Sequence, residues 1–192
     1  MKTLQMAKTL LPVILILSVF LSNPAHAELV QGTFAQSPWT AFPGDFRLTP
    51  AFPDTCSRYD TFVFKPDSGD FDLLKVTGQF PHARYFSFNL YDYFYATDFA
   101  ALADIEIQPD TGHINPFDPD QRRDAEDRSY TLYLVKEGVP APADAKNVMV
   151  LPAGVETLGL FLRVYRPDQG YDSLGGVALP VIEALKADLS SG

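Results

Sequence analysis

The stretch Arg84-Tyr85-Phe86-Ser87-Phe88-Asn89-Leu90-Tyr91-Asp92 decides the fold that this sequence predicts. Apolar side chains at its even positions from 86 to 90 alternate with tyrosine, serine and asparagine at its odd positions from 85 to 91. A period of two is typical of a half-buried β-strand, because successive side chains point to opposite faces of a sheet. We therefore expect a strand with one apolar face and one polar aromatic face.

Further strands are expected on both sides of this stretch. The turn Pro66-Asp67-Ser68-Gly69 predicts that the two segments flanking it pair as an antiparallel hairpin, because proline presets the backbone and glycine accepts positive φ. The segments with strand-like composition or alternation are Tyr59–Phe64, Phe71–Val76, Ile105–Gln108, Tyr130–Val135, Val148–Leu151 and Leu158–Tyr165.

Only two segments have helical character. A short helical turn is expected from Thr97 to Ala103, and Leu179–Leu189 spaces its apolar residues at helical intervals. These are too few helices for βαβ crossovers. The predicted fold is all-β: an antiparallel β-sandwich, jelly-roll-like, with a short C-terminal helix.

The first 27 residues have the composition of an export signal. Lys2 and Lys8 precede an apolar run from Leu10 to Leu21, and Ala25-His26-Ala27 has the small-x-small form of a cleavage site. We expect cleavage after Ala27, a periplasmic or secreted protein, and no transmembrane anchor after cleavage. An uncleaved anchor is the alternative, although the run is short for a membrane span of about 20 residues.

Residues 28–192 are long enough for one domain, with 28–57 expected to form an irregular N-terminal arm that Trp39 and Phe42 fix to the core. Cleavage removes two of the fifteen basic residues and no acid, so the mature chain carries a net charge of −11. This acidity argues against nucleic acid and anionic lipid as partners. Cys56 is the only cysteine, so no intramolecular disulfide can form, and a buried, inert thiol is the simplest expectation.

Three segments in order resemble a bacterial family. They are Ala83–Asp92 and Ile107–Phe117, followed by Leu162–Pro167 with Gly175–Pro180. Together they resemble the domain-of-unknown-function family numbered twelve-fourteen and its relatives. The resemblance spans roughly Tyr59 to Leu185. It implies an exported β-sandwich of jelly-roll type and no established activity.

The sequence predicts neither a metal site nor a catalytic site, and no cofactor. Only His82 and His113 remain after signal cleavage, and neither belongs to a metal-binding or nucleophile-elbow motif. The acidic loops at 67–72 and 118–127 lack the EF-hand pattern, and solvated loops are the simpler interpretation.

The remaining candidate is a ligand-binding patch. Arginine, tyrosine and asparagine side chains recur on the two strongest strands and in the Ile107–Phe117 segment, and together they can bind carboxylates or sugars. Internal ion pairs for the arginines are the alternative. We expect a binding protein for a small polar or anionic molecule, a glycan or a partner protein; a hydrolase or lyase acting on a small polar substrate is the second hypothesis. The candidate residues are Arg84, Tyr85, Asn89, Tyr91, Asn115, Arg163 and Tyr165.

Overall fold

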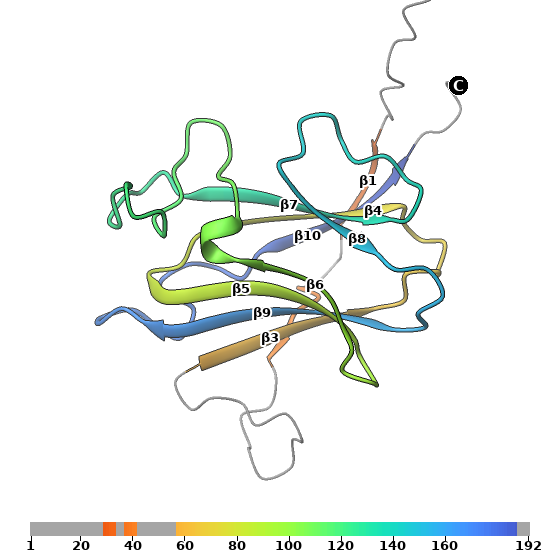
Figure 1. The fold of residues 1–192 in the computed structure, drawn as a ribbon, viewed down its shortest axis with the longest axis horizontal. Helices are drawn as coiled ribbons and strands as arrows, with labels where there is room; N and C mark the ends of the chain where they lie inside the picture. Colours follow the sequence, from red (N-terminus) through yellow and green to blue (C-terminus); the bar gives the residue numbers. More distant parts are fainter. Residues whose placement is uncertain (1–28, 34–36, 42–56, 188–192) are drawn as a thin grey trace, which may run out of the picture.

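The computed structural model describes residues 29–33, 37–41 and 57–187, and within these ranges the regular secondary structure is almost entirely β-strand (Figure 1). The only helical element there is a single 3₁₀ turn, η1 (Asp104–Glu106). The strands are β1 (Leu29–Thr33), β2 (Thr40–Ala41), β3 (Ser57–Phe64), β4 (Leu73–Gln79), β5 (Ala83–Asp92), β6 (Asp98–Ala103), β7 (Ser129–Lys136), β8 (Asn147–Leu151), β9 (Leu158–Pro167) and β10 (Val181–Ala187).

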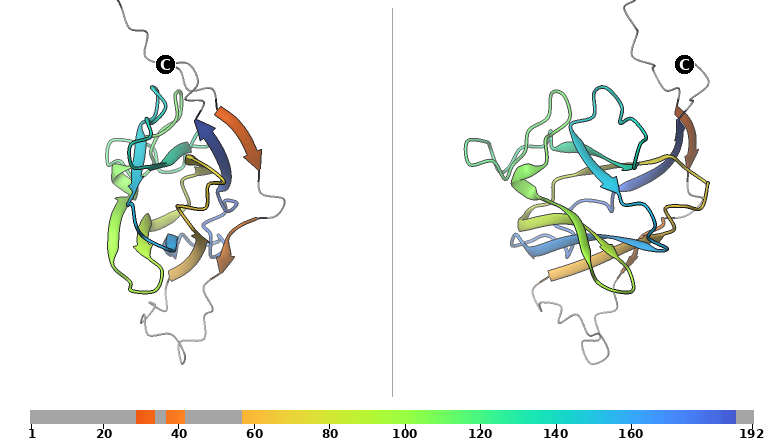
Figure 2. Two further views of the ribbon diagram at one scale, coloured as in Figure 1. Left: turned by 90° about the vertical axis from the view of Figure 1, so that its right-hand side faces the viewer. Right: turned by 45° about the vertical axis from the view of Figure 1, so that its right-hand side comes forward.

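The strands form two five-stranded sheets that lie in separate layers (Figure 2). The first sheet has the order β1-β10-β4-β7-β8, and the second has the order β2-β3-β9-β5-β6. All pairs are antiparallel except β7 with β8. This confirms the predicted β-sandwich.

The topology is that of a jelly roll. With β2 and β8 set aside, the other eight strands, renumbered along the chain, have the order 1-8-3-6 in one sheet and 2-7-4-5 in the other. This order is the double Greek key of the jelly roll, in which most connections cross from one sheet to the other.

The core lies between the two sheets, as the alternation along β5 predicted. Phe86, Phe88 and Leu90 are fully buried, and the inward side chains of β9 from Leu158 to Val164 pack beside them. Tyr130 on β7 fills the centre, with its ring 5.8 Å from that of Phe88 and 5.1 Å from that of Phe80. Apolar area removed from water by these contacts is the main stabilising term of the sandwich.

The predicted C-terminal helix is wrong, because residues 181–187 form β10 between β1 and β4. The error has a physical cause. Ile182 faces the core between the sheets, whereas Leu185 packs on the outer face of the first sheet with Leu73 and Val135. Apolar side chains on opposite faces of one strand produce a three-residue spacing that resembles a helix.

Two predictions around β6 are also wrong. In the Thr97–Ala103 segment, residues Asp98–Ala103 form the strand β6, paired with β5, although its alanines favour a helix in isolation. The Ile105–Gln108 segment is not a strand, because η1 occupies its beginning. Sheet pairing outweighs intrinsic propensity in the first case.

The predicted hairpin between Tyr59–Phe64 and Phe71–Val76 does not form. β3 belongs to the second sheet and β4 to the first, so the connection at Pro66–Gly69 passes from one layer to the other. Phe64 and Phe71 meet across this connection with their ring centres 6.0 Å apart. Burying both rings between the layers explains why the two strands part.

The expected irregular arm contributes β1 and β2 to the two sheets, one strand to each. Trp39 is buried, and its indole Nε1 donates a 2.7 Å hydrogen bond to the carbonyl oxygen of Pro180. Phe42, Cys56 and the expected signal peptide lie outside the described residues. Within the described ranges, no helix has the length and apolar character needed to cross a membrane.

Candidate functional site

The outward side of β9 carries the candidate site. Because Leu158, Leu160, Leu162 and Val164 point into the core, the residues between them point away from it. Arg163 lies between Tyr59 on β3 and Ser87 on β5 in the strand register. We call the following set the tyrosine–arginine face: Tyr59, Tyr85, Asn89, Tyr91, Phe161, Arg163 and Tyr165.

Arg163 is the central residue of this face. Its guanidinium lies 5.5 Å from the ring centre of Tyr59 and 5.5 Å from that of Tyr91. Its Nη2 donates a 2.7 Å hydrogen bond to the Tyr91 hydroxyl, and its Nε is buried with no hydrogen-bond partner among the residues that the structure describes. No carboxylate among the described residues forms a salt bridge with it. In the described part of the chain, the cation is therefore held by aromatic rings and by no acid.

Two tyrosine hydroxyls meet beside Arg163. Tyr59 and Tyr165 share a 2.5 Å hydrogen bond, and the ring of Tyr85 packs edge-on against that of Tyr165 at 5.6 Å. On the other side of Arg163, Tyr91 packs edge-on against Phe161 at 5.4 Å. These contacts fix the rings in defined orientations, which lowers the entropy that a ligand would have to remove on binding.

Asn89 adds an amide to the face. Its Oδ1 accepts a 2.8 Å hydrogen bond from the Ser87 hydroxyl, and no described residue bonds its NH₂ group. Asn89 is partly exposed, whereas Ser87 is buried beneath its neighbours. The amide can therefore donate to a ligand while the serine holds it in place.

The structure does not bring Arg84 and Asn115 to this face. Arg84 is exposed at the start of β5 and, by alternation, belongs to the side opposite Tyr85. Asn115 is buried in a loop, where its Nδ2 donates to the carbonyl oxygens of Asp104 and Ile107 and its Oδ1 accepts from the Phe117 amide. All its polar atoms hold the loop in shape. The five other predicted residues, Tyr85, Asn89, Tyr91, Arg163 and Tyr165, do lie together.

A structural ion pair is present, but it involves a different arginine. Arg58 Nε donates to Asp60 Oδ2 at 2.7 Å, and Nη2 donates to Oδ1 at 3.0 Å. The hydrogen bond to Asp60 raises the pKa of Arg58, against the opposing effect of burial. The Asp60 side chain is 1% exposed. Arg58 therefore has a bidentate acidic partner, and Arg163 has none among the described residues.

The two histidines do not form a site together. His82 stacks on Tyr171, with the ring centres 4.2 Å apart, and burial together with the charge of Arg128 lowers its pKa. His113 uses Nδ1 to accept a 3.1 Å hydrogen bond from the Ser129 amide. Each histidine thus holds a loop at one end of the sandwich.

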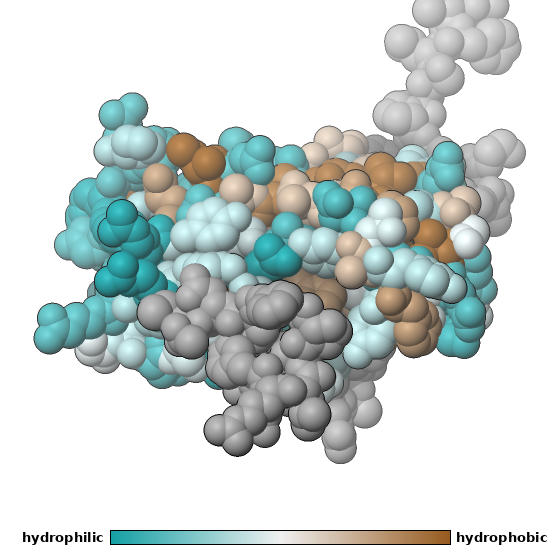
Figure 3. All heavy atoms as spheres, turned by 60° about the horizontal axis from the view of Figure 1, so that its bottom comes forward, coloured by the Kyte–Doolittle hydropathy of each residue, from teal (hydrophilic) through white to brown (hydrophobic). Residues whose placement is uncertain are grey.

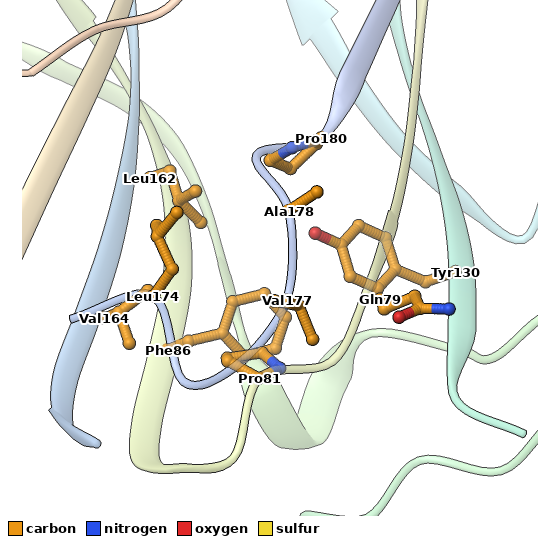
Figure 4. A pocket seen from close by; sticks show the side chains of 10 residues that line it. All are labelled: Gln79, Pro81, Phe86, Tyr130, Leu162, Val164, Leu174, Val177, Ala178 and Pro180. Carbon is orange, nitrogen blue, oxygen red and sulfur yellow. The ribbon is translucent and has the colours of Figure 1, made fainter. Parts of the chain in front are cut away.

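A small cavity lies in the described part of the space between the sheets. It lies among the side chains that Figure 4 shows, where the Tyr130 hydroxyl projects toward Ala178 and Pro180. Its volume is about 10 Å³, which is about the space that one water molecule needs. This cavity is far smaller than the roughly 300–1,000 Å³ of ligand pockets in general.

A surface hollow of about 230 Å³ lies beside η1 and the loop that follows it. It is smaller than the roughly 300–1,000 Å³ of ligand pockets in general. Two of its polar lining residues, His113 and Asn115, already use hydrogen-bonding atoms within the protein. It is a weaker candidate than the tyrosine–arginine face.

The acidic loop at 118–127 belongs to the left end of the molecule in Figure 1, and hydrophilic side chains gather at that end in Figure 3. Asp118 caps the backbone amide of Asp120, and Asp124 pairs with Arg122. No group of three or more His, Cys, Asp or Glu side chains in the described ranges could hold a metal ion.

The sequence interpretation missed Tyr59 and Phe161 as members of the face. The signal was available in their strands, since Tyr59 is out of phase with the apolar Phe62 and Phe64, and Phe161 alternates with the inward leucines of β9. What the sequence lacked was the pairing of β3 with β9, which places Tyr59 opposite Arg163.

Comparison with known proteins gives little additional information. No family model matches the chain, and no curated protein matches it. A crystal structure of the VPA0106 protein from Vibrio parahaemolyticus is similar, with 15% sequence identity and a TM-score of 0.43. The match covers 67% of this chain and 30% of that protein, so the chain spans less than a third of the length of this neighbour.

Proposed function

We propose that the tyrosine–arginine face binds an anionic, hydroxyl-rich ligand, of which a sugar that carries a carboxylate is the simplest example. The observation that carries the proposal is the position of Arg163. It is a cation held between two tyrosine rings, with no acidic partner among the described residues. A cation that is partly removed from water is costly unless an anion joins it.

The other residues of the face suit the same ligand. Aromatic rings offer flat surfaces to the apolar faces of sugar rings, and tyrosine hydroxyls and an asparagine amide bond hydroxyl groups. The guanidinium fork matches the two oxygens of a carboxylate.

The test is titration calorimetry of the protein with galacturonate and with neutral galactose. The wild type is expected to bind galacturonate and to prefer it to galactose. Arg163→Met is expected to weaken galacturonate binding about tenfold or more, since a hydrogen bond to a charged group contributes about 1.5–3 kcal/mol. Arg84→Met is the matched control, because Arg84 is exposed and lies off the face.

Two results would contradict the binding proposal. One is equal affinity of the wild type and Arg163→Met for galacturonate, with both proteins folded by circular dichroism. The other is the absence of binding to acidic sugars, with a large fall in the melting temperature of Arg163→Met. The second result would make Arg163 a structural residue, held by cation–π contacts alone.

The second function is a lyase that acts on an acidic sugar. The hydroxyl pair of Tyr59 and Tyr165 favours it, because two hydroxyls 2.5 Å apart can pass a proton beside the Arg163 cation. In such a reaction a base removes the proton next to the carboxylate, and the bond to the neighbouring sugar oxygen breaks as that oxygen takes a proton. Formation of an unsaturated sugar from polygalacturonate, followed by its ultraviolet absorbance, would favour the lyase over simple binding.

The location of the protein is a further part of the proposal. The basic residues, apolar run and Ala25-His26-Ala27 support export to the periplasm or outside the cell, and the resemblance to the domain-of-unknown-function family supports the same location. N-terminal sequencing of protein from an envelope fraction should begin at Glu28. An intact Met1 on membrane-bound protein would contradict export with cleavage.

A further inference from the structure

The aromatic surface continues beyond Arg163 to the far end of β9. Gly159 is the outward residue two positions before Phe161, and it has no side chain to interrupt the surface. A Cβ atom built on Gly159 would lie 2.9 Å from Cε2 of Phe161 and 3.1 Å from Cδ2 of Tyr93. Both rings therefore border the space over the glycine, and Tyr93 extends the row of rings from β9 to the tip of the β5–β6 hairpin.

The hairpin tip holds Tyr93 in a defined position. The Tyr93 amide donates a 3.0 Å hydrogen bond to the carbonyl oxygen of Thr157, which ties the tip to the chain just before β9. The Asp92 carboxylate accepts hydrogen bonds from the amides of Phe94 and Tyr95, both at 2.9 Å. Side-chain capping of this kind orders a turn. Tyr93 is 42% exposed, so its ring is open to a ligand.

The row is long compared with a single sugar. From Gly159 to Tyr165 the strand advances six residues, or roughly 20 Å at about 3.4 Å per residue. Aromatic rings occupy both ends of this path, with Tyr93 at one end and Tyr165 and Tyr85 at the other, and Arg163 lies between them. In Figure 1 the path follows β9 from the hairpin tip at the right to the strand end at the left.

We propose that the ligand of the tyrosine–arginine face is a chain of acidic sugars that lies along β9, with Tyr93 as a separate contact for its distal units. The inference rests on the proposed function and names its ligand as a polymer. Repeated aromatic rings along one line match a repeated sugar ring, and each ring adds a contact that a single sugar cannot make.

The chemistry favours a polysaccharide over an acidic peptide. A peptide binds sheets best at an open edge, where backbone hydrogen bonds are free. β9 lies in the middle of its sheet and is paired on both sides, with β3 and with β5. What the face offers is ring surfaces, tyrosine hydroxyls and one amide, which are the groups that sugars use.

The test compares mono-, di-, tetra- and hexagalacturonate by titration calorimetry. The affinity of the wild type is expected to rise about tenfold or more from the monosaccharide to the hexasaccharide. Tyr93→Ala is expected to lower the affinity for the hexasaccharide to nearly that of the disaccharide, and to leave the monosaccharide affinity unchanged. Arg163→Met should weaken binding of every length.

Tyr95→Ala is the matched control, because Tyr95 lies on the same tip without a ring contact to the row among the described residues. It should bind like the wild type. Equal affinities for the monosaccharide and the hexasaccharide would overturn the polymer inference and leave the proposed function intact. The absence of binding at every length would overturn the proposed function itself. If polyglutamate bound as tightly as the hexasaccharide, this would overturn the choice of a polysaccharide over an acidic peptide.

Discussion

Arg163 on β9 donates a 2.7 Å hydrogen bond from Nη2 to the hydroxyl of Tyr91 on β5. The same guanidinium lies 5.5 Å from the Tyr91 ring centre, so one tyrosine contributes both a polar contact and an aromatic contact. These two contributions can be separated, because phenylalanine keeps the ring and removes only the hydroxyl.

Tyr91→Phe should lower the free energy of unfolding by about 1 kcal/mol, the usual net value of one hydrogen bond. The loss arises because Nη2 keeps its charge and loses its only described acceptor. Urea denaturation measures it. Tyr85→Phe is the matched control, since no described residue bonds the Tyr85 hydroxyl, and it should leave stability unchanged. Equal stability of both variants and the wild type would show that water replaces the Tyr91 hydroxyl without cost.

Removing either member of the ion pair between Arg58 and Asp60 should lower the free energy of unfolding, but by different amounts. Arg58→Met leaves the carboxylate of Asp60 buried and unpaired, and should cost about 3 kcal/mol. Asp60→Ala should cost less, because the Arg58 side chain is 31% exposed and can turn toward water. Urea unfolding of the two variants shows which substitution lowers the free energy of unfolding more.

The control for this pair is Arg122→Met, which removes the exposed pair with Asp124. Because surface ion pairs contribute about 0–1 kcal/mol, this variant should be nearly as stable as the wild type. The opposite order, with Asp60→Ala the more damaging substitution, would show that the carboxylate has a second role in the core.

His82 should make stability depend on pH near neutrality. Burial and the charge of Arg128 lower its pKa below the ordinary 6.5, so the unfolded chain binds a proton more readily than the folded protein. The free energy of unfolding should therefore rise with pH from the lowered folded pKa up to 6.5, and then level off. Asp104, whose pKa burial raises above 3.8, acts in the opposite direction in the acid range.

Urea unfolding between about pH 5 and pH 8 measures the His82 effect, because histidine is the side chain that titrates in this range. His82→Gln should flatten the curve, and His113→Gln should retain it. A slope that survives His82→Gln would assign the effect to another group.

The free energy of unfolding should be sensitive to a substitution in the core at the centre of β5. Phe88 is fully buried, so Phe88→Ala should cost about 3–5 kcal/mol through lost burial and a residual cavity. Phe94, which is 68% exposed at the hairpin tip, provides a control of the same chemistry. Phe94→Ala should change the free energy of unfolding by less than about 0.5 kcal/mol. A small cost at Phe88 would contradict the inward face assigned to β5.

The sequence by itself determined which side chains of β5 and β9 point inward, because alternation with period two is a local property of the chain. Phe86, Phe88 and Leu90 were assigned to the core on this pattern alone, and all three are fully buried. The grouping of Tyr85, Asn89 and Tyr91 follows from the same pattern.

Only the tertiary structure decided which strands are neighbours. Pairing of β9 with β3 and β5 depends on contacts between residues distant in the chain, and no local pattern encodes them. This pairing brought Tyr59 to Arg163, whereas hydrogen bonds to Asp104, Ile107 and Phe117 made Asn115 a loop-holding residue. Pairing in the other sheet made a strand of 181–187, because a place between β1 and β4 buries both Ile182 and Leu185, whereas a helix on the surface would expose more of its backbone and apolar side chains to water.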